Sequence, residues 1–317
     1  MKRKRNVFLC VFLGALLLFT VYVLLDTFVI VRRLETAAEA QPISKQSMDE
    51  AAEVTEGTSN ASLLASLTTE NENTEPITTE NCFRDENISV EITEERIGDT
   101  TVYVADVKLA SSEYLRTAFA DNTYGRNVTD TTSCIAETVN AVLAINGDFY
   151  GAQQSGYVIR NGVLYRSTVK KGAEDLVIYS DGSFAIIRES AVTAEELLES
   201  GAQQVLSFGP ALIENGTIAV SVNDEVGRAK SSNPRTAIAV IDDLHYLFVV
   251  SDGRTEESEG LSLYELASFL QSKGAQTAYN LDGGGSSTMV FNDLVVNNPT
   301  SGRSIKERSV SDIVYIG

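Results

Sequence analysis

Three aspartates follow apolar stretches of the chain at points where a β-strand would end. They are Asp148, Asp252 and Asp282. A carboxylate held at a strand end is a candidate for acid–base or nucleophilic catalysis. We expect folding to bring all three to one rim, but the sequence does not say which is the acid, the base or the nucleophile.

Three arginines accompany these aspartates and have no obvious helical salt-bridge partner. They are Arg235, Arg254 and Arg308. A guanidinium group binds phosphate through two parallel hydrogen bonds, so we assign the arginines, Arg235 foremost, to a phosphate of the substrate. We expect no cofactor and assign no metal ligand, although the residues leave open whether a divalent cation binds.

A run of three glycines, followed by two serines, separates two apolar segments that read as strands. The run is Gly283, Gly284, Gly285, Ser286 and Ser287. Successive backbone N–H groups in such a loop can form an anion-binding nest. Asn146, at the end of another predicted strand, joins these residues as a candidate substrate contact. The loop is not a P-loop, because no lysine follows and the next segment reads as a strand.

Carboxylates, arginines and a glycine loop together suit a sugar joined to a phosphate. A phosphate ester leaves more easily than an alcohol, so strong general-acid help matters less and an arginine clamp on the departing charge matters more. The same set would also suit a non-catalytic module that binds an anionic glycan. A pure phosphate binder gains nothing from three nearby negative charges, which favours the enzyme.

The overall charge and the rare residue types exclude several classes of function. The 317 residues contain 25 Lys+Arg and 44 Asp+Glu, a net charge of -19, which argues against nucleic-acid binding. His245 is the single histidine, and we interpret it as structural. Cys82 and Cys134 are predicted either to form a disulfide or to stay as free thiols.

The first quarter of the chain is predicted to form a membrane anchor and a tether. Four basic residues at positions 2–5 precede the uncharged span Val7–Leu25, which is just long enough to cross a bilayer. We expect residues 1–33 to form a signal anchor with a cytoplasmic N-terminus, residues 34–85 an acidic disordered stalk, and residues 86–317 an extracytoplasmic domain. A cleaved signal peptide is the alternative, with Ala38-Glu39-Ala40 as its cleavage site.

From Ile88 onward, short apolar runs alternate with turn signals. Asn161-Gly162 and Asp181-Gly182 each separate two strand-like runs, and the pairs Thr193/Glu196 and Ser262/Glu265 are capping boxes that open helices. Many hairpins and few helices predict an α+β domain, a twisted β-sheet core with a few flanking helices, preceded by one transmembrane helix and the stalk.

These motifs, in this order, resemble the phosphodiester glycosidase family. The resemblance covers residues 88–317 and rests on six segments: Ala144–Tyr150, Ser207–Gly216, Asn233–Thr236, Asp252–Arg254, Asn280–Val290 and Glu307–Val310. It implies hydrolysis of a sugar linked through C1 to a phosphodiester, with a phosphate-linked surface glycan or exopolysaccharide as substrate. It names neither the sugar, nor an inverting or retaining course, nor the oligomeric state.

Overall fold

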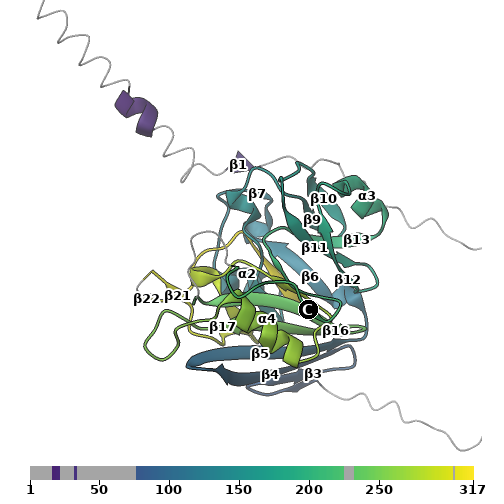
Figure 1. Ribbon diagram of the computed structural model, residues 1–317, viewed down its shortest axis with the longest axis vertical. Coiled ribbons are helices and arrows are strands. Elements are labelled where there is room, and N and C mark those ends of the chain that lie inside the picture. The colour runs from purple at the N-terminus through teal and green to yellow at the C-terminus, as the bar shows by residue number, and fades with distance from the viewer. Residues whose placement is uncertain (1–15, 22–31, 34–75, 225–231, 303) are drawn as a thin grey trace, which may run out of the picture.

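The computed structural model describes residues 16–21, 32–33, 76–224, 232–302 and 304–317 (Figure 1). The largest sheet in this part of the chain has nine strands, all paired antiparallel. Their order is β15 (Thr217–Ile218), β14 (Ala211–Glu214), β18 (Thr277–Asn280), β16 (Arg235–Asp242), β17 (His245–Ser251), β5 (Thr100–Leu109), β4 (Ile88–Ile97), β3 (Cys82–Arg84) and β2 (Ile77–Thr78).

Two five-stranded antiparallel sheets pack against this sheet. One has the order β10 (Val163–Arg166), β9 (Val158–Arg160), β13 (Ala202–Leu206), β11 (Glu174–Tyr179) and β12 (Phe184–Arg188). The other has the order β20 (Leu294–Val295), β19 (Met289–Phe291), β8 (Leu143–Asn146), β23 (Asp312–Ile316) and β6 (Leu115–Phe119).

The remaining elements are short. Two strand pairs stand apart from the large sheets: β1 (Arg32–Arg33) with β7 (Gly125–Arg126), and β21 (Thr300–Ser301) with β22 (Ser304–Ile305). The α-helices in the described part of the domain are α2 (Thr132–Thr138), α3 (Ala194–Glu199) and α4 (Leu263–Ser272). Single 3₁₀ turns are η1 (Ser112–Tyr114), η2 (Ala120–Asn122), η3 (Tyr150–Ala152) and η4 (Gly284–Ser286).

The central strands of the large sheet are buried on both faces, which is why their sequences are almost continuously apolar. Along β17, Leu247 and Val249 face α4, while Phe248 and Val250 face the smaller sheets. Side chains alternate between the two faces of a strand, so one apolar run supplies two separate cores. Helix α4 crosses one face of the sheet (Figure 1) and buries its stripe of Leu263, Leu266, Ala267 and Leu270 there.

The local turn and cap signals are confirmed. Asn161 and Gly162 have φ angles of 50° and 74°, the left-handed pair that a tight two-residue hairpin requires, and they join β9 to β10. Both capping boxes form, with Thr193 and Ser262 as the N-cap residues of α3 and α4. The prediction of a sheet-rich α+β domain with few helices is therefore confirmed for the described residues.

The domain begins earlier than the sequence predicted. Strand β3 pairs with β4 through Cys82 and Glu91, and β2 pairs with β3, so the folded part includes residues before 86. These strands escaped prediction because they are two and three residues long, too short to show an alternating pattern of apolar and polar residues. Cys82 and Cys134 are free thiols, which decides between the two alternatives against the disulfide.

The predicted anchor and most of the predicted stalk lie outside the described residues. Within Val7–Leu25 the structure describes residues 16–21, which are helical. Among the described residues, no helix has both the length and the apolar character needed to cross a membrane.

Candidate active site

The ends of five strands from two sheets meet at one edge of the domain. In the large sheet, Arg235 pairs with Ser251 and Ala237 with Asn280, so the start of β16 lies beside the ends of β17 and β18. In the sheet that contains β8, Ile313 pairs with Asn146, which places the start of β23 beside the end of β8. The segments with Asp148, Asp252, Asp282 and the glycine loop all follow these ends.

Asn146 joins the two sheets at this edge. Its Oδ1 atom accepts hydrogen bonds from the Thr236 hydroxyl (2.8 Å) and the Thr288 N–H (3.2 Å), and its Nδ2 donates to the Asp282 carbonyl (2.6 Å). The side chain is fully buried, so its expected contact with substrate is not what the geometry shows. Asn146 instead holds the backbone on both sides of the glycine loop.

Two arginines lie against the glycine loop. A Cβ atom at Gly284 would lie 2.8 Å from Nη2 of Arg254, and one at Gly285 would lie 2.6 Å from Nη2 of Arg308. Only glycine leaves room for the guanidinium groups at these positions. The loop itself is less open than the predicted nest, because the N–H groups of Gly284, Ser286 and Ser287 donate to backbone carbonyls.

The third arginine of the cluster lies behind these two. Arg235 is buried, and its Nε donates to the Leu261 carbonyl (2.8 Å), while Arg254 and Arg308 are exposed. Arg254 has the unusual φ angle of 63°, and its Nη2 donates to the Asn233 amide oxygen at 2.9 Å. Burial, and then the positive charges of Arg308 and Arg235, lower the pKa of Arg254. The predicted arginine cluster therefore forms, and its members repel one another.

Asp282 is the aspartate that lines a cavity beside this cluster. The cavity has a volume of about 160 Å³, and its walls include Asp282, Ser286, Arg308 and Phe149. The Ser286 hydroxyl donates to Asp282 Oδ2 at 2.7 Å. Burial raises the pKa of Asp282, whereas the hydrogen bond from Ser286 and the charge of Arg308 oppose that rise. Asp282 thus combines a perturbed carboxyl group with an arginine and an open space.

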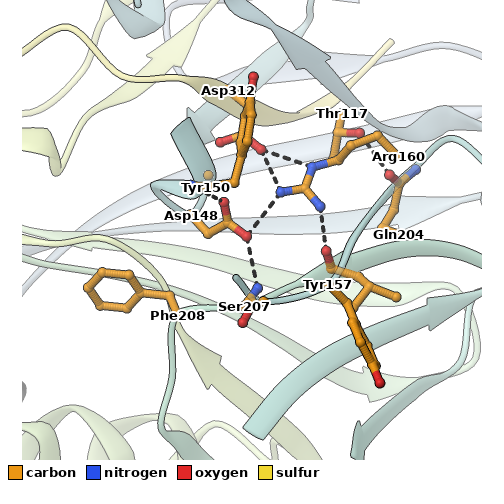
Figure 2. Close-up of polar contacts among 12 residues, drawn as sticks. Thr117, Asp148, Tyr150, Tyr157, Arg160, Gln204, Ser207, Phe208 and Asp312 are labelled. Atoms are coloured by element: carbon orange, nitrogen blue, oxygen red, sulfur yellow. Dashed lines mark hydrogen bonds and ion pairs between the residues drawn. The ribbon is translucent and has the colours of Figure 1, made fainter. Parts of the chain in front are cut away.

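Asp148 lies inside the protein, in a network with Arg160 and Asp312 (Figure 2). Its Oδ1 accepts the Tyr150 N–H (2.9 Å) and its Oδ2 accepts the Ser207 N–H (2.8 Å). Arg160 lies between Asp148 and Asp312, with Nη2 3.0 Å and 2.8 Å from their Oδ2 atoms. Asp148 is 1% exposed, so the structure places it beneath the rim at which the sequence predicted it. Its negative charge nevertheless contributes to the raised pKa of Asp282.

Asp252 anchors a different segment. Its Oδ1 accepts the Asn298 N–H (2.8 Å), and its Oδ2 accepts the Asn298 side-chain amide (3.0 Å). Burial, followed by the charge of Asp252, raises the pKa of Tyr103 to about 12. These bonds fix the start of the segment that carries β21 and β22, so the structure gives this carboxylate a positioning task and does not place it in the cavity.

The far end of that segment is fixed by Glu307, which the sequence did not single out as a site residue. Its Oε1 accepts the Ser133 N–H (3.0 Å) and its Oε2 accepts the Ser133 hydroxyl (2.5 Å), at the first turn of α2. Arg308 follows directly. The signal in the sequence that could have identified Glu307 is its position directly before Arg308, an arginine that we assign to the phosphate.

Two further polar residues complete the account. Ser287 is completely buried at the end of the glycine loop, where its carbonyl accepts a hydrogen bond from the Asn297 side-chain amide at 3.0 Å. His245 is at the opposite end of β17 from Ser251, and its Nε2 lies 3.0 Å from Asp106 Oδ1, in agreement with a structural role. Within the residues described, no group of three or more His, Cys, Asp or Glu side chains is arranged to hold a metal ion.

Antiparallel sheets carry arginines, a half-buried carboxyl group and a glycine turn at one edge, a set of groups that a hydrolase could use. Residues 139–317 match the family model described as phosphodiester glycosidase. The chain belongs to the phosphodiester glycosidase family.

Two relatives illustrate the range of this similarity. The chain is 29% identical over 198 residues to the SPbeta prophage-derived uncharacterized protein YomE of Bacillus subtilis, covering 61% of this chain and 30% of that protein. It is 30% identical over 175 residues to N-acetylglucosamine-1-phosphodiester alpha-N-acetylglucosaminidase of Mus musculus, covering 50% and 33%. The chain thus spans about a third of the length of these relatives.

Solved structures share the fold. The auto-inhibited catalytic domain of the zebrafish N-acetylglucosamine-1-phosphodiester alpha-N-acetylglucosaminidase aligns with a TM-score of 0.57 and 20% identity, over 72% of this chain and 82% of that one. A hypothetical protein from Synechocystis aligns with a TM-score of 0.53 and 17% identity, over 73% and 62%.

Proposed function

We propose that the protein is a glycosidase that hydrolyses a sugar-1-phosphodiester linkage in a surface glycan or exopolysaccharide. The observation that carries the proposal is the placement of Asp282 and Arg308 in one cavity, with Arg254 against the same glycine loop. Family membership supports the same chemistry. We further propose that the N-terminal span holds the protein in the cell membrane with the domain outside, on the strength of the basic tip and the uncharged run that follows it.

In this reaction water adds to C1 of the sugar, and the bond between C1 and the phosphate oxygen breaks. The products are the free sugar and a phosphate monoester, with one proton released or taken up by a nearby base. Negative charge on the departing phosphate increases in the transition state, so preorganised guanidinium groups lower the barrier. Arg254 and Arg308 are the exposed cations that we assign to this charge, with Arg235 behind them.

Asp282 is the residue that we assign to acid–base or nucleophilic work. It lies close to Arg308, and burial raises the pKa of its carboxyl group, which is the direction of shift that favours a proton-exchanging role. Asp148 and Asp252 support the loops around it and do not contact the substrate in this proposal.

The test is release of free reducing sugar from the methyl phosphodiester of N-acetylglucosamine 1-phosphate by the full-length protein in detergent. We expect Asp282→Asn to fold normally and to lose at least about 100-fold in kcat, the usual scale of general acid–base catalysis. We expect Arg308→Ala to lower kcat/KM for this diester more than for an uncharged glycoside. The exposed residues Asp293 and Arg84 provide the matched controls Asp293→Asn and Arg84→Ala.

Near-normal turnover by Asp282→Asn would contradict the assignment of that residue. Binding of the diester by the unmutated protein without any release of sugar, across a panel of sugars, would replace the hydrolase with the non-catalytic binding module.

A further inference from the structure

Two partly exposed phenylalanines stand next to the cavity of Asp282 and Arg308. Phe149 forms part of the wall of that cavity, and Phe208 lines the neighbouring hollow together with Gly209 and Pro210. The two ring centroids are 5.3 Å apart, and the ring planes meet at 65°. The rings therefore form an aromatic corner between two openings of the surface, beside the groups that we assign to the phosphodiester.

The buried charge network holds both rings in place. Asp148 accepts the N–H of Tyr150, the residue after Phe149, and the N–H of Ser207, the residue before Phe208. The Phe208 N–H donates to the Tyr279 hydroxyl at 2.9 Å. In Figure 2 the Phe208 ring points away from Asp148 and Arg160. One carboxylate thus fixes the two loops that carry the corner.

Other aromatic residues near this edge are used in the core. Phe119, Tyr124, Tyr150 and Tyr165 pack against one another, with Tyr124 and Tyr150 stacked at 5.2 Å. The chain has no tryptophan. In the described part of the chain, Phe149 lines the cavity of Asp282, and Phe208, which is also partly exposed, packs edge-on against the Phe149 ring.

We propose that Phe149 and Phe208 bind the sugar ring of the substrate, while Arg254 and Arg308 bind its phosphate. This inference rests on the proposed function. A pyranose has an apolar face of C–H groups that carry partial positive charge, and the face of an aromatic ring carries partial negative charge. A binding site of this kind combines apolar walls with a few polar groups that fix orientation. The corner and the arginines supply these two parts side by side, and C1 of the sugar would then lie between them, next to Asp282.

Binding to the full-length protein in detergent, measured by ligand-observed NMR, tests the proposal without requiring turnover. The two probes are the methyl phosphodiester of N-acetylglucosamine 1-phosphate and dimethyl phosphate, which has the same charge and no sugar. We expect Phe149→Ala and Phe208→Ala each to weaken binding of the sugar diester about tenfold, the effect of losing one good ring contact. Binding of dimethyl phosphate should change less than about twofold, and Phe208→Tyr should restore binding of the sugar diester.

Phe184→Ala is the matched control, because Phe184 is also partly buried and stacks on Tyr246 away from the cavity. Wild-type affinity of both alanine variants for the sugar diester would overturn the proposal. So would an equal loss for dimethyl phosphate, an equal loss in Phe184→Ala, or no binding of the sugar diester to the unmutated protein at millimolar concentration. If the sugar diester binds in a way that depends on the two rings but no sugar is released, the aromatic site stands and the proposed hydrolase activity is contradicted.

Discussion

The Oδ2 atom of Asp148 lies 3.0 Å from Nη2 of Arg160, and both side chains are almost completely buried. Arg160 also bonds Asp312, so one guanidinium links the end of β9 to the loop after β8 and to the start of β23. Burying charges is costly unless each is paired, and here the pairing joins two sheets under the candidate site. Asp148 and Asp282, which look alike in the sequence as strand-end aspartates, therefore have different tasks.

This difference predicts a different outcome for the same substitution at the two positions. Asp148→Asn leaves Arg160 buried with Asp312 as its remaining carboxylate, so we expect the free energy of unfolding to fall by about 3 kcal/mol. Urea unfolding followed by circular dichroism measures the loss. Asp282 lies in a partly exposed cavity, so we expect the free energy of unfolding of Asp282→Asn to stay within about 0.5 kcal/mol of that of the unmutated protein. Equal stabilities of the two variants would contradict the structural task of Asp148.

The sequence predicted the turns and helix caps, which depend on residues close together in the chain. It did not predict the contacts between residues that are far apart in the chain. Asn161-Gly162 and the capping boxes act over three or four positions, so their residue types specify the turn or cap directly. The partner of Asp148 comes from Arg160 on another strand, and Asp312 is 152 positions from Arg160 in the chain. The positions of Asp148 and Asp312 in the sequence do not show that both contact Arg160. Asp148 therefore appeared equivalent to the other two strand-end aspartates, Asp252 and Asp282.

The sequence predicted which arginines belong to the cluster, but not which of them are buried or what they contact. Arg235, Arg254 and Arg308 stood out because no helical partner was near them in sequence. That Arg235 is buried while the other two lie against Gly284 and Gly285 depends on the fold of the whole edge. The aromatic corner was present in the motifs around Asp148 and Ser207, yet nothing local shows that the two rings meet.

The close approach of Arg308 to Gly285 gives a second prediction. In Gly285→Ala the new Cβ would overlap the guanidinium, because it would lie only 2.6 Å from Nη2, so Arg308 must move away from the loop. We expect inhibition by dimethyl phosphate to weaken about tenfold, the loss of one charge-assisted contact. Gly317→Ala is the control, since the nearest atom to its Cβ position is at 3.4 Å, an ordinary contact. Unchanged inhibition in Gly285→Ala would show that Arg308 does not bind the phosphate.

The bond between Glu307 and Ser133 gives a third prediction, for a residue that positions Arg308 without touching substrate. Glu307→Ala frees the chain next to Arg308 from α2. We expect kcat/KM for the sugar diester to fall about fivefold, with part of the loss in KM, because Arg308 binds the phosphate in the ground state and stabilises its increasing charge in the transition state. Glu307→Gln, which can still accept from Ser133, should recover most of the affinity. Glu137→Ala, an exposed change on the same helix, is the control. A fall in kcat with constant KM would point to a direct part in the reaction.

The last prediction concerns the pH dependence of stability and rests on Asp175. Burial and then the neighbouring carboxylate of Glu189 raise the pKa of Asp175 from 3.8 to about 8, and Asp148 adds to the rise. Between about pH 4 and pH 8 the folded protein holds a proton that the unfolded chain has lost. The free energy of unfolding should therefore fall as the pH rises through this window and level off above it. Asp175→Asn should reduce the slope, while the exposed change Asp293→Asn should leave it unchanged. Urea unfolding from about pH 5 to about pH 9 measures the slopes, and equal slopes in the two variants would show that Asp175 is ionised in the folded state.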